Sequence, residues 1–506
     1  MGAEPEPVPV NPAAAAVVFL VSFPAHGHVS PMLRLARALA TRGVAATVAV
    51  PDFVHRRIVG NVGAGVELAS IESGVPDDGE GEPPGFASFA HSMEHRMPAS
   101  LEAMLLKKKT TPRHGDVAAC LVIADVLASW AVPVAARCGV PAVGFWPAML
   151  ATYRVVAAIP ELIDEGLISD LGIPISVRRL NNGEQKVNGD QQIGDSLHVL
   201  PAELELSTAE LPWLVGDAAC QKSRFTFWLR TMERAKGFRA ILVNTFPGEV
   251  IADSAGEHLL HASLVLQILQ VGPLPTKGAF GCDLLLDDSP PAKNPSMWQT
   301  DDTCMDWLDQ QREGSVIYVS FGSWVASIGP DAINELALGL EATGRPFIWA
   351  LKDEPSWREG LPRQYTSGSI AGRGKIVGWA PQEDVLQHKA VGCYLTHCGW
   401  NSTLEAIQHG VRLLCYPVAG DQFINCAYIV KMWQTGIRLW STERSVVHDC
   451  VERIMEGEEG RRMQEKVVEL RERVMLDETR CAAKRNLDSF VDGIMREDFV
   501  LGQLSL

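Results

Sequence analysis

The chain has 506 residues and a formal net charge of −16, with 47% apolar and 21% charged residues. This length predicts about two to four domains, and the composition is typical of a soluble globular protein. Because an acidic surface repels polyanions, we expect neither nucleic acid nor an anionic membrane as a partner.

The start of the chain shows no export or membrane signal. Residues 1–12 are acidic and rich in proline, without the basic start of a signal peptide, and we expect a flexible tail. The apolar run at 13–21 is too short to span a bilayer and is interpreted as the first buried strand. Eleven cysteines without a C-x-x-C pair favour a reduced chain over a disulfide scaffold or zinc site. These features predict a cytoplasmic protein without a membrane span.

The first half of the chain alternates predicted strands and helices. Ser30 and Pro31 are typical of a helix start, with serine as the cap and proline in the first turn, and Gly43 ends this helix. Short apolar runs predict strands at 17–22, 44–50, 120–123, 142–145 and 240–243. Strands of this kind separated by helices favour a doubly wound parallel sheet.

A second α/β half follows a linker. Residues 277–298 are rich in glycine, aspartate, serine and proline and are interpreted as that linker. The pattern restarts with strands at 315–320 and 347–351 around a helix at 330–340, and helices are expected at 459–473 and 481–500. We expect an amino-terminal domain at 13–276, a carboxy-terminal domain at 299–480, and a cleft at the carboxyl ends of both sheets.

The segment from Trp379 to Gln422 contains more residues suited to ligand binding than any other part of the chain. A predicted strand at 392–396 runs into His397, after which Asn401 and Ser402 open a helix that Gly410 stops. A strand that feeds a helix through small residues presents backbone amides to an anion such as a diphosphate. Taken alone, an Asn-Ser pair is more often a simple helix cap.

Other side chains of this segment suit the rest of a sugar nucleotide. Trp379 follows a predicted strand at 375–378 and can stack on a flat base. Glu405, one turn into the helix, can accept from ribose hydroxyls. Asp421 and Gln422 follow a strand at 412–415 and can bind a sugar. A single tryptophan is usually a core residue. Only the combined spacing of all these residues favours a binding site.

Two further motifs suggest an acid–base pair. In FPAHGHVSPM, His28 lies after the first strand, and imidazole takes up protons near neutral pH. In LVIADVLASW, Asp125 ends another strand and could orient that imidazole or merely cap the following helix. His26 and His28 could also form a metal pair, but no further ligand motif lies nearby. In SFGS, Ser323 could donate to a phosphate.

Residues 379–422 resemble, nearly position for position, the signature box of plant-type (family 1) UDP-sugar glycosyltransferases, and the two motifs resemble that family's first loop and strand-end aspartate. The resemblance implies a GT-B fold of two Rossmann-like domains, an acceptor site in the first, and a last helix (481–506) that crosses back to it. It implies inverting, metal-independent transfer of glucose from UDP-glucose, with no cofactor. His28 would act as base with Asp125. The implied donor-binding residues are Ser323, Trp379, Ala380, Gln382, His397, Trp400, Asn401, Ser402, Glu405, Asp421 and Gln422.

The departures from the family pattern are few, and the acceptor stays open. Arg412 replaces a proline, His26 a glutamine, and Gly420 leaves room before Asp421. We expect a small lipophilic acceptor, a monomer, and a pocket lined by Phe145, Trp146, the aperiodic segment 178–195 and Trp213. Two rival hypotheses are a non-catalytic sugar-nucleotide-binding protein, expected to lack His28 or Asp125, and a nicotinamide-dependent dehydrogenase, against which the missing G-x-G-x-x-G motif counts.

Overall fold

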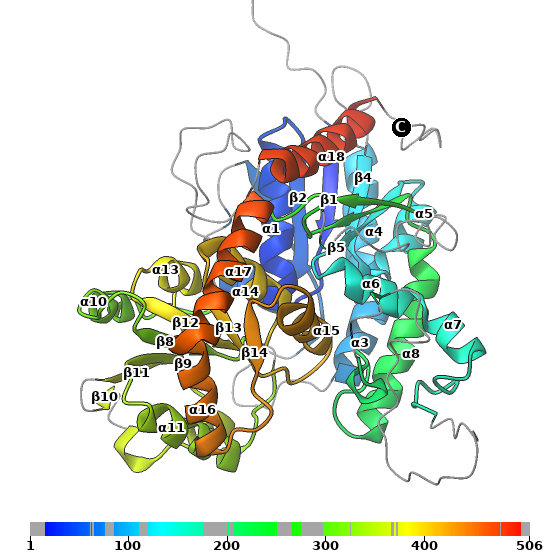
Figure 1. Ribbon diagram of the computed structural model, residues 1–506. Coiled ribbons are helices and arrows are strands. Elements are labelled where there is room, and N and C mark those ends of the chain that lie inside the picture. Colours follow the sequence, from blue (N-terminus) through cyan, green and yellow to red (C-terminus); the bar gives the residue numbers. More distant parts are fainter. Residues whose placement is uncertain are drawn as a thin grey trace, which may run out of the picture.

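A computed structural model gives the architecture of the chain (Figure 1). It describes residues 16–60, 62, 65–75, 86–110, 120–175, 200–201, 204, 206–247, 249, 266–274, 297–323, 325–365, 369–370, 373–475 and 477–496. The expected tail at 1–12, the segment 178–195 and nearly all of the expected linker at 277–298 lie outside these residues.

Two seven-stranded sheets organise the chain, each in the strand order of a Rossmann fold. The first has the order β3-β2-β1-β4-β5-β6-β7 and is parallel throughout; the second has the order β10-β11-β9-β8-β12-β13-β14 and is parallel except for β10. The strands of the first sheet are Val17–Val21 (β1), Ala45–Pro51 (β2), Val66–Ile71 (β3), Cys120–Asp125 (β4), Ala142–Trp146 (β5), Ala240–Val243 (β6) and Gln267–Gln270 (β7). Those of the second are Val316–Ser320 (β8), Phe347–Ala350 (β9), Ser369–Ile370 (β10), Gly374–Val377 (β11), Val391–Thr396 (β12), Arg412–Cys415 (β13) and Gly436–Arg438 (β14).

Helices connect the parallel strands. Those between the strands of the first sheet are His26–Ala40 (α1), Asp52–Ile58 (α2), Phe86–His95 (α3), Met97–Thr110 (α4), Ala131–Arg137 (α5), Leu150–Ala157 (α6), Ile159–Asp164 (α7) and Ala218–Ala235 (α8). The later ones are Thr303–Leu308 (α10), Pro330–Ala342 (α11), Pro355–Arg358 (α12), Gln382–Gln387 (α13), Trp400–His409 (α14), Gln422–Ala427 (α15), Arg444–Met455 (α16), Gly457–Met475 (α17) and Asp477–Met495 (α18). The central strands β1, β5 and β8 are buried along their whole length, as expected for sheets covered on both faces.

Each sheet has a switch point where the strand order reverses, and these points position the site. In the first sheet β1 lies between β2 and β4; in the second, β8 lies between β9 and β12. Ligands of open α/β sheets bind beyond the carboxyl ends of the strands at such a point. We therefore expect ligand-binding or catalytic residues in the loops after β1, β4, β8 and β12.

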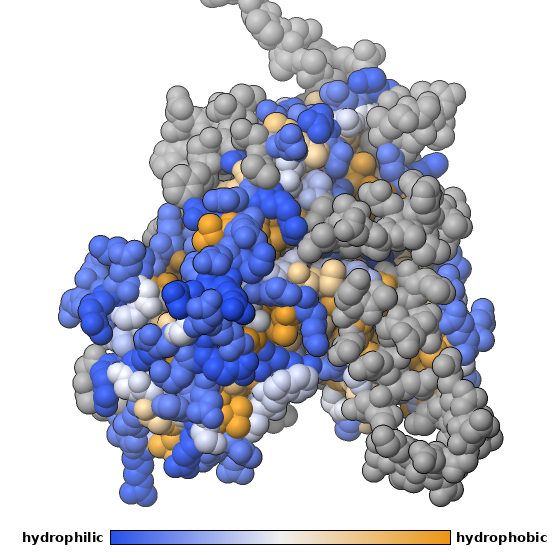
Figure 2. Space-filling model, viewed as in Figure 1, coloured by the Kyte–Doolittle hydropathy of each residue, from blue (hydrophilic) through white to orange (hydrophobic). Residues whose placement is uncertain are grey.

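The last helix joins the two halves of the molecule. Apolar side chains of α18, which are Leu487, Phe490, Val491 and Ile494, pack into the core that contains β1, β2 and α1. Asn486 donates to the carbonyl of Gln270 at 2.9 Å. In Figure 1 α18 lies over the first sheet after α17 has run along the second. The visible face over α16 and α17 is mostly hydrophilic in Figure 2, and no described helix has the length and apolar character needed to cross a bilayer.

One predicted helix boundary is wrong. The first helix was expected to begin at Ser30 and Pro31, but α1 begins at His26, with Ala25 as N-cap, and Pro31 lies inside it. The amides of His28 and Val29 already donate to the carbonyl of Ala25, at 2.8 and 2.9 Å. The segment that contains His28 is therefore the first turn of a helix and not a loop that precedes one.

Candidate active site

A histidine–aspartate pair occupies the switch point of the first sheet. His28 lies in the first turn of α1, and Asp125 is the last residue of β4. Nδ1 of His28 lies 2.7 Å from Oδ2 of Asp125. Asp125 is fully buried, whereas the His28 side chain is 21% exposed. Because Nδ1 faces the carboxylate, Nε2 is the ring nitrogen left to accept a proton from a ligand.

Asp125 both caps a helix and orients His28. Its Oδ1 accepts from the amide of Leu127 at 2.9 Å and so caps the short 3₁₀ helix Val126–Ala128. Asp125 therefore fills both roles that the sequence left open, as a helix cap and as the residue that orients the imidazole. A carboxylate fixed by the backbone on one oxygen holds the imidazole rigidly with the other.

A second histidine occupies the switch point of the second sheet in a different environment. His397 follows β12 and is 8% exposed. Burial lowers its pKa to about 4, so the ring is neutral near pH 7. Its buried Nδ1 has no hydrogen-bond partner among the described residues. A neutral ring with an unpaired nitrogen suits a polar ligand and not proton transfer.

A glycine makes room for this ring. Gly322 has a φ of +72°, and a Cβ there would lie 2.7 Å from two ring atoms of His397. Only glycine fits this conformation and this contact. Ser323 follows directly and is half-buried. The expected phosphate-binding serine therefore lies in the loop after β8, one residue after the glycine that contacts His397.

The helix after β12 begins close to the first domain. Helix α14 starts at Trp400 with Gly399 as N-cap and no side-chain cap, so Asn401 and Ser402 lie in its first turn. The interpretation of the Asn-Ser pair as a cap is therefore wrong. Nδ2 of Asn401 donates to the carbonyl of Gly27 in α1 at 2.7 Å. The amide side of Asn401 thus binds the other domain.

Pro31 explains why that carbonyl is available. A helix carbonyl normally accepts from the amide four residues later, and Pro31 has no N–H to give Gly27. Asn401 supplies the missing donor from the opposite domain. The Oδ1 of Asn401 is buried and has no partner among the described residues.

Glu405 lies at the centre of a buried polar network. Its Oε2 accepts from Nε2 of Gln382 at 2.8 Å, and its Oε1 accepts from Nη2 of Arg34 at 3.1 Å. The same amide nitrogen of Gln382 also lies 3.0 Å from Oγ of Ser402. Burial raises the pKa of Glu405, the charge of Glu383 adds to the rise, and Arg34 opposes it. Arg34 was not singled out from the sequence, because nothing near it in the chain indicates its partners.

Trp379 belongs to an aromatic cluster. Its ring stacks on Trp298 with centroids 4.5 Å apart and an angle of 26°. The ring of His26 meets both indoles edge-on, at 5.6 Å from Trp298 and 5.8 Å from Trp379. Burial lowers the pKa of His26 to about 4, with Arg34 adding to the effect. His26 is thus a neutral packing residue, and among the described residues the only candidate metal group does not include it or His28.

The two residues expected to bind the sugar begin α15. Asp421 accepts from Nδ2 of Asn425 at 3.0 Å. Burial raises the pKa of Asp421, while Asn425 and the nearby charge of His28 oppose the rise. Oε1 of Gln422 accepts from the amides of Val418 and Ala419 at 2.8 and 2.9 Å, which leaves its Nε2 to donate. Asp421 of the second domain therefore lies near enough to His28 of the first for a charge on the imidazole to affect it.

Two other predicted donor residues are buried. Ala380 is 3% exposed and lies in the apolar core. The indole Nε1 of Trp400 donates to the carbonyl of Asn244 at 2.8 Å, which is a contact between the two domains. The Trp400 side chain therefore holds the domains together, and only its backbone could meet a ligand.

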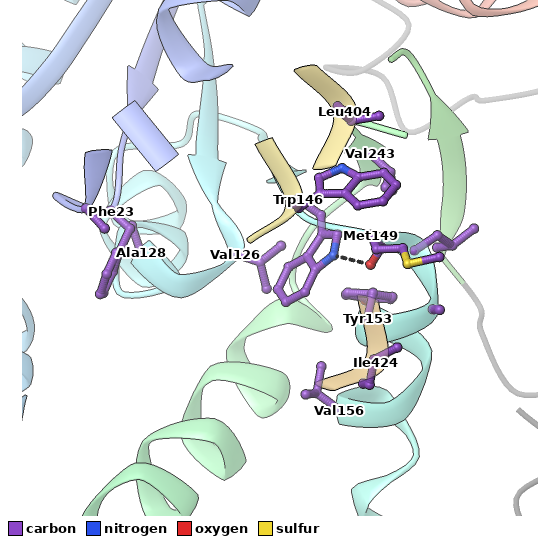
Figure 3. Close-up of a cluster of buried hydrophobic side chains, with 14 of the residues drawn as sticks. Phe23, Val126, Ala128, Trp146, Met149, Tyr153, Val156, Val243, Leu404 and Ile424 are labelled. Atoms are coloured by element: carbon purple, nitrogen blue, oxygen red, sulfur yellow. Dashed lines mark hydrogen bonds between the residues drawn. The ribbon is translucent and has the colours of Figure 1, made fainter. Parts of the chain in front are cut away.

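Three aromatic residues expected to line an acceptor pocket are core residues instead. Phe145 and Trp213 are 0% exposed, and Nε1 of Trp213 donates to the carbonyl of Gly172 at 2.8 Å. Trp146 is 2% exposed, and its indole donates to the carbonyl of Met149 at 2.9 Å (Figure 3). This expectation is wrong because Phe145 and Trp146 end the buried strand β5, and Trp213 packs against Phe225 of α8. The same core cluster includes Leu404 and Ile424, so apolar packing continues across the domains.

Three buried cysteines lie close together in the second domain. Cys398, Cys415 and Cys426 are buried, and their sulfur atoms lie within 4.8 Å of one another. They come from the turn after β12, the end of β13 and α15. Small thiols pack well in a core. Their sequence spacing has no C-x-x-C signature, so this cluster could not be predicted from the chain.

Comparisons with known proteins agree with this arrangement. The family model described as UDP-glucoronosyl and UDP-glucosyl transferase matches residues 300–464. The chain is 41% identical over 481 residues to UDP-glycosyltransferase 82A1 of Arabidopsis thaliana, covering 93% of this chain and 96% of that protein. It is 32% identical to DIMBOA UDP-glucosyltransferase BX8 of Zea mays, over 90% of this chain and 93% of that protein. The structure of Os79 from O. sativa in complex with UDP matches with a TM-score of 0.76 at 24% identity, over 94% of this chain and 100% of that one.

The similarity extends over nearly the full length of both chains. The chain therefore belongs to the plant family 1 UDP-glycosyltransferases and is a glycosyltransferase with the GT-B fold.

Proposed function

We propose that the enzyme transfers glucose from UDP-glucose to a hydroxyl of a small lipophilic acceptor, with inversion, to give a β-O-glucoside. The observation that supports this most is the position of His28. Its Nδ1 is held by Asp125 at 2.7 Å, and the ring lies near enough to Asp421 of the opposite domain for a positive charge on it to act on that carboxylate. A base on one domain beside a sugar-binding carboxylate on the other is what direct transfer needs.

The donor would extend along the switch point of the second sheet. Trp379 would stack on the uracil, and Glu405 would accept from the ribose. Asp421 and the Nε2 of Gln422 would hold the glucose. The diphosphate would meet the first turn of α14, whose backbone amides attract an anion; its ligands would be Ser323, His397, Asn401 and Ser402. Neutral His397 suits this role because a protonated ring is not required to donate a hydrogen bond.

Transfer would follow a single displacement. Nε2 of His28 takes the proton of the acceptor hydroxyl as its oxygen attacks the anomeric carbon, and the bond between that carbon and the UDP oxygen breaks. Asp125 stabilises the imidazolium that forms. Attack from the face opposite UDP turns an α-linked donor into a β-linked product. The proton leaves His28 for solvent after the product departs.

The division of labour between the domains is part of the proposal. Residues 13–276 would bind the acceptor, residues 299–480 the donor, and the segment 481–506 would tie the second to the first. Since one chain supplies both His28 and the donor residues, a monomer is sufficient for activity. The presence of both His28 and Asp125 argues against a non-catalytic binding protein.

A donor and acceptor screen tests the proposal. Purified enzyme is incubated with UDP-glucose and a panel of hydroxylated aglycones, with UDP-galactose, UDP-xylose and UDP-glucuronate in parallel. We expect hexosylated products by mass spectrometry, a β anomeric configuration by NMR, preference for UDP-glucose, and unchanged rates with a chelator. An α-linked product would contradict the displacement, and a preference for another sugar would contradict the role of Gln422. Thermal stabilisation by NAD instead of UDP would favour a dehydrogenase.

Trp379→Ala tests the donor pose separately. Loss of a base–aromatic stack is expected to weaken UDP binding by about 1–3 kcal/mol. Trp440→Ala, at an indole that is 76% exposed, is the matched control and should leave UDP binding unchanged. Equal affinities of the Trp379 variant and the wild type would place the uracil elsewhere.

A further inference from the structure

A buried arginine of the first domain reaches the donor site of the second. Arg34 lies on α1, six residues after His28, and its side chain is 6% exposed. Its Nη2 donates to Oε1 of Glu405 at 3.1 Å and also to Oε1 of Glu383. Both carboxylates belong to the donor signature, on α14 and α13. The cation thus links the expected ribose acceptor to the helix that carries the base.

The surroundings of Arg34 indicate a role beyond packing. Its Nε is buried and has no hydrogen-bond partner among the described residues. An unsatisfied N–H beside a ligand-binding carboxylate is available to a nucleotide oxygen. A carboxylate can accept about four hydrogen bonds, so Glu405 can keep Arg34 and Gln382 and still receive ribose hydroxyls.

Arg34 supplies the positive charge that counters the surroundings of Glu405. Burial and the neighbouring Glu383 both favour the protonated form of Glu405, whereas the charge of Arg34 and the hydrogen bonds from Gln382 and Arg34 oppose them. Gln382 and Ser402 are neutral members of the network. Phenols also lie nearby and stay protonated: Tyr318 and Tyr394, whose hydroxyls donate to Gln382. His26 also faces Arg34 from α1, and it is neutral near pH 7.

We propose that Arg34 is a positioning residue for the donor: it keeps Glu405 ionised and aimed at the ribose, and ties this acceptor to the helix that bears His28. The inference rests on the proposed function. Six residues of helix span about 9 Å, so ribose recognition and the base are fixed to one rigid element. A donor held by Glu405 would thereby be aligned with the base of the other domain.

The test compares UDP with 2′-deoxy-UDP by isothermal titration between pH 5 and pH 8. The ratio of the two dissociation constants isolates the ribose contact, since phosphate titration affects both ligands equally. At high pH we expect the wild type to bind UDP at least about tenfold more tightly than 2′-deoxy-UDP. This preference should fall as the pH is lowered through the pKa of Glu405, because a protonated carboxyl is the weaker acceptor.

Two variants should shift the pH at which the preference for UDP over 2′-deoxy-UDP declines, and they should shift it in opposite directions. Arg34→Met removes the cation, so the fall should move to higher pH by about one unit or more. Glu383→Gln removes the competing carboxylate, so the fall should move to lower pH, and this variant keeps the test decisive if Arg34→Met does not fold. Arg34→Lys should restore most of the wild-type profile. Arg42→Met is the matched control, because Arg42 lies two residues after the end of α1 and pairs with Asp488 of α18 instead of a residue of the donor signature.

The outcomes separate the inference from the proposed function. If UDP affinity drops in Arg34→Met but the pH profile of the ratio coincides with that of the wild type, Arg34 is merely structural and the inference fails. An unshifted Glu383→Gln profile overturns it as well. If the wild type transfers glucose yet shows no preference for UDP over 2′-deoxy-UDP at any pH, the ribose does not contact Glu405. A wild type that binds no UDP would refute the proposed function itself.

Discussion

The two switch points carry the same side chain in opposite environments. His28, after β1, keeps a carboxylate partner at 2.7 Å and partial exposure. His397, after β12, is buried against Gly322 without a carboxylate, and its pKa falls to about 4. The strand order is the same in both sheets, but His28 follows the switch-point strand β1, whereas His397 follows β12, the strand beside its switch-point strand β8. The local surroundings of each imidazole therefore decide whether it can take up a proton or can only donate and accept hydrogen bonds.

Among the substitutions that test this comparison, His28→Ala should cause the largest loss of activity. A positioned base contributes about 10²–10⁴-fold, so kcat should fall by that factor while UDP affinity stays within a few-fold. Steady-state kinetics and UDP titration measure the two separately. His26→Ala is the control from the same helical turn, and its kcat should fall far less. Comparable losses in both variants would remove the distinction between base and packing histidine.

Asp125→Asn tests the carboxylate that distinguishes the two histidines. An asparagine can still cap through its oxygen to the amide of Leu127, so the melting temperature should stay near that of the wild type. Its amide would instead donate to Nδ1 of His28, which places the ring proton on Nε2 and removes the acceptor. We expect kcat to fall by up to the loss in His28→Ala. An unchanged kcat would mean that Asp125 serves only as a cap.

His397 should make the fold sensitive to acid. The unfolded chain protonates this ring near pH 6.5, and the folded chain only near 4, so stability falls as the pH drops through that range. At pH 5 the loss is about 2 kcal/mol relative to pH 8. Denaturant unfolding at pH 8 and pH 5 measures it. In His397→Gln this share of the loss should disappear, whereas an identical loss in the variant would place the acid sensitivity elsewhere, for example at His26.

Local sequence rules predicted most of the second switch point and less of the first. The strand at 391–396, the helix after it and its stop at Gly410 follow from apolar runs and glycine, which act within a few residues. The start of α1 was missed because Pro31 is typical of a first turn. Its missing N–H is compensated by Asn401, which donates to Gly27 across a separation of 374 residues. The pairing of Arg34 with Glu405 and the meeting of three cysteines depend on equally distant partners, so no local pattern could indicate them.

The smallest expected effect concerns the link between the two switch points. Pro31→Ala would give the carbonyl of Gly27 a donor within α1, so the bond from Asn401 should weaken. A neutral hydrogen bond contributes about 0.5–1.5 kcal/mol, and alanine is the better helix residue. We therefore expect a few-fold loss of transfer rate with a melting temperature that is unchanged or higher.

A double-mutant cycle of Pro31→Ala with Asn401→Ala sharpens this prediction. If the proline matters because it frees the Gly27 carbonyl for Asn401, the loss of rate from Asn401→Ala should be smaller in the Pro31→Ala background. Residues coupled through a shared partner deviate from additivity by about 0.5 kcal/mol or more. Losses that simply add would show that Pro31 only shapes the helix. Coupling would show that a proline in one domain prepares the contact through which the donor helix of the other reaches the base.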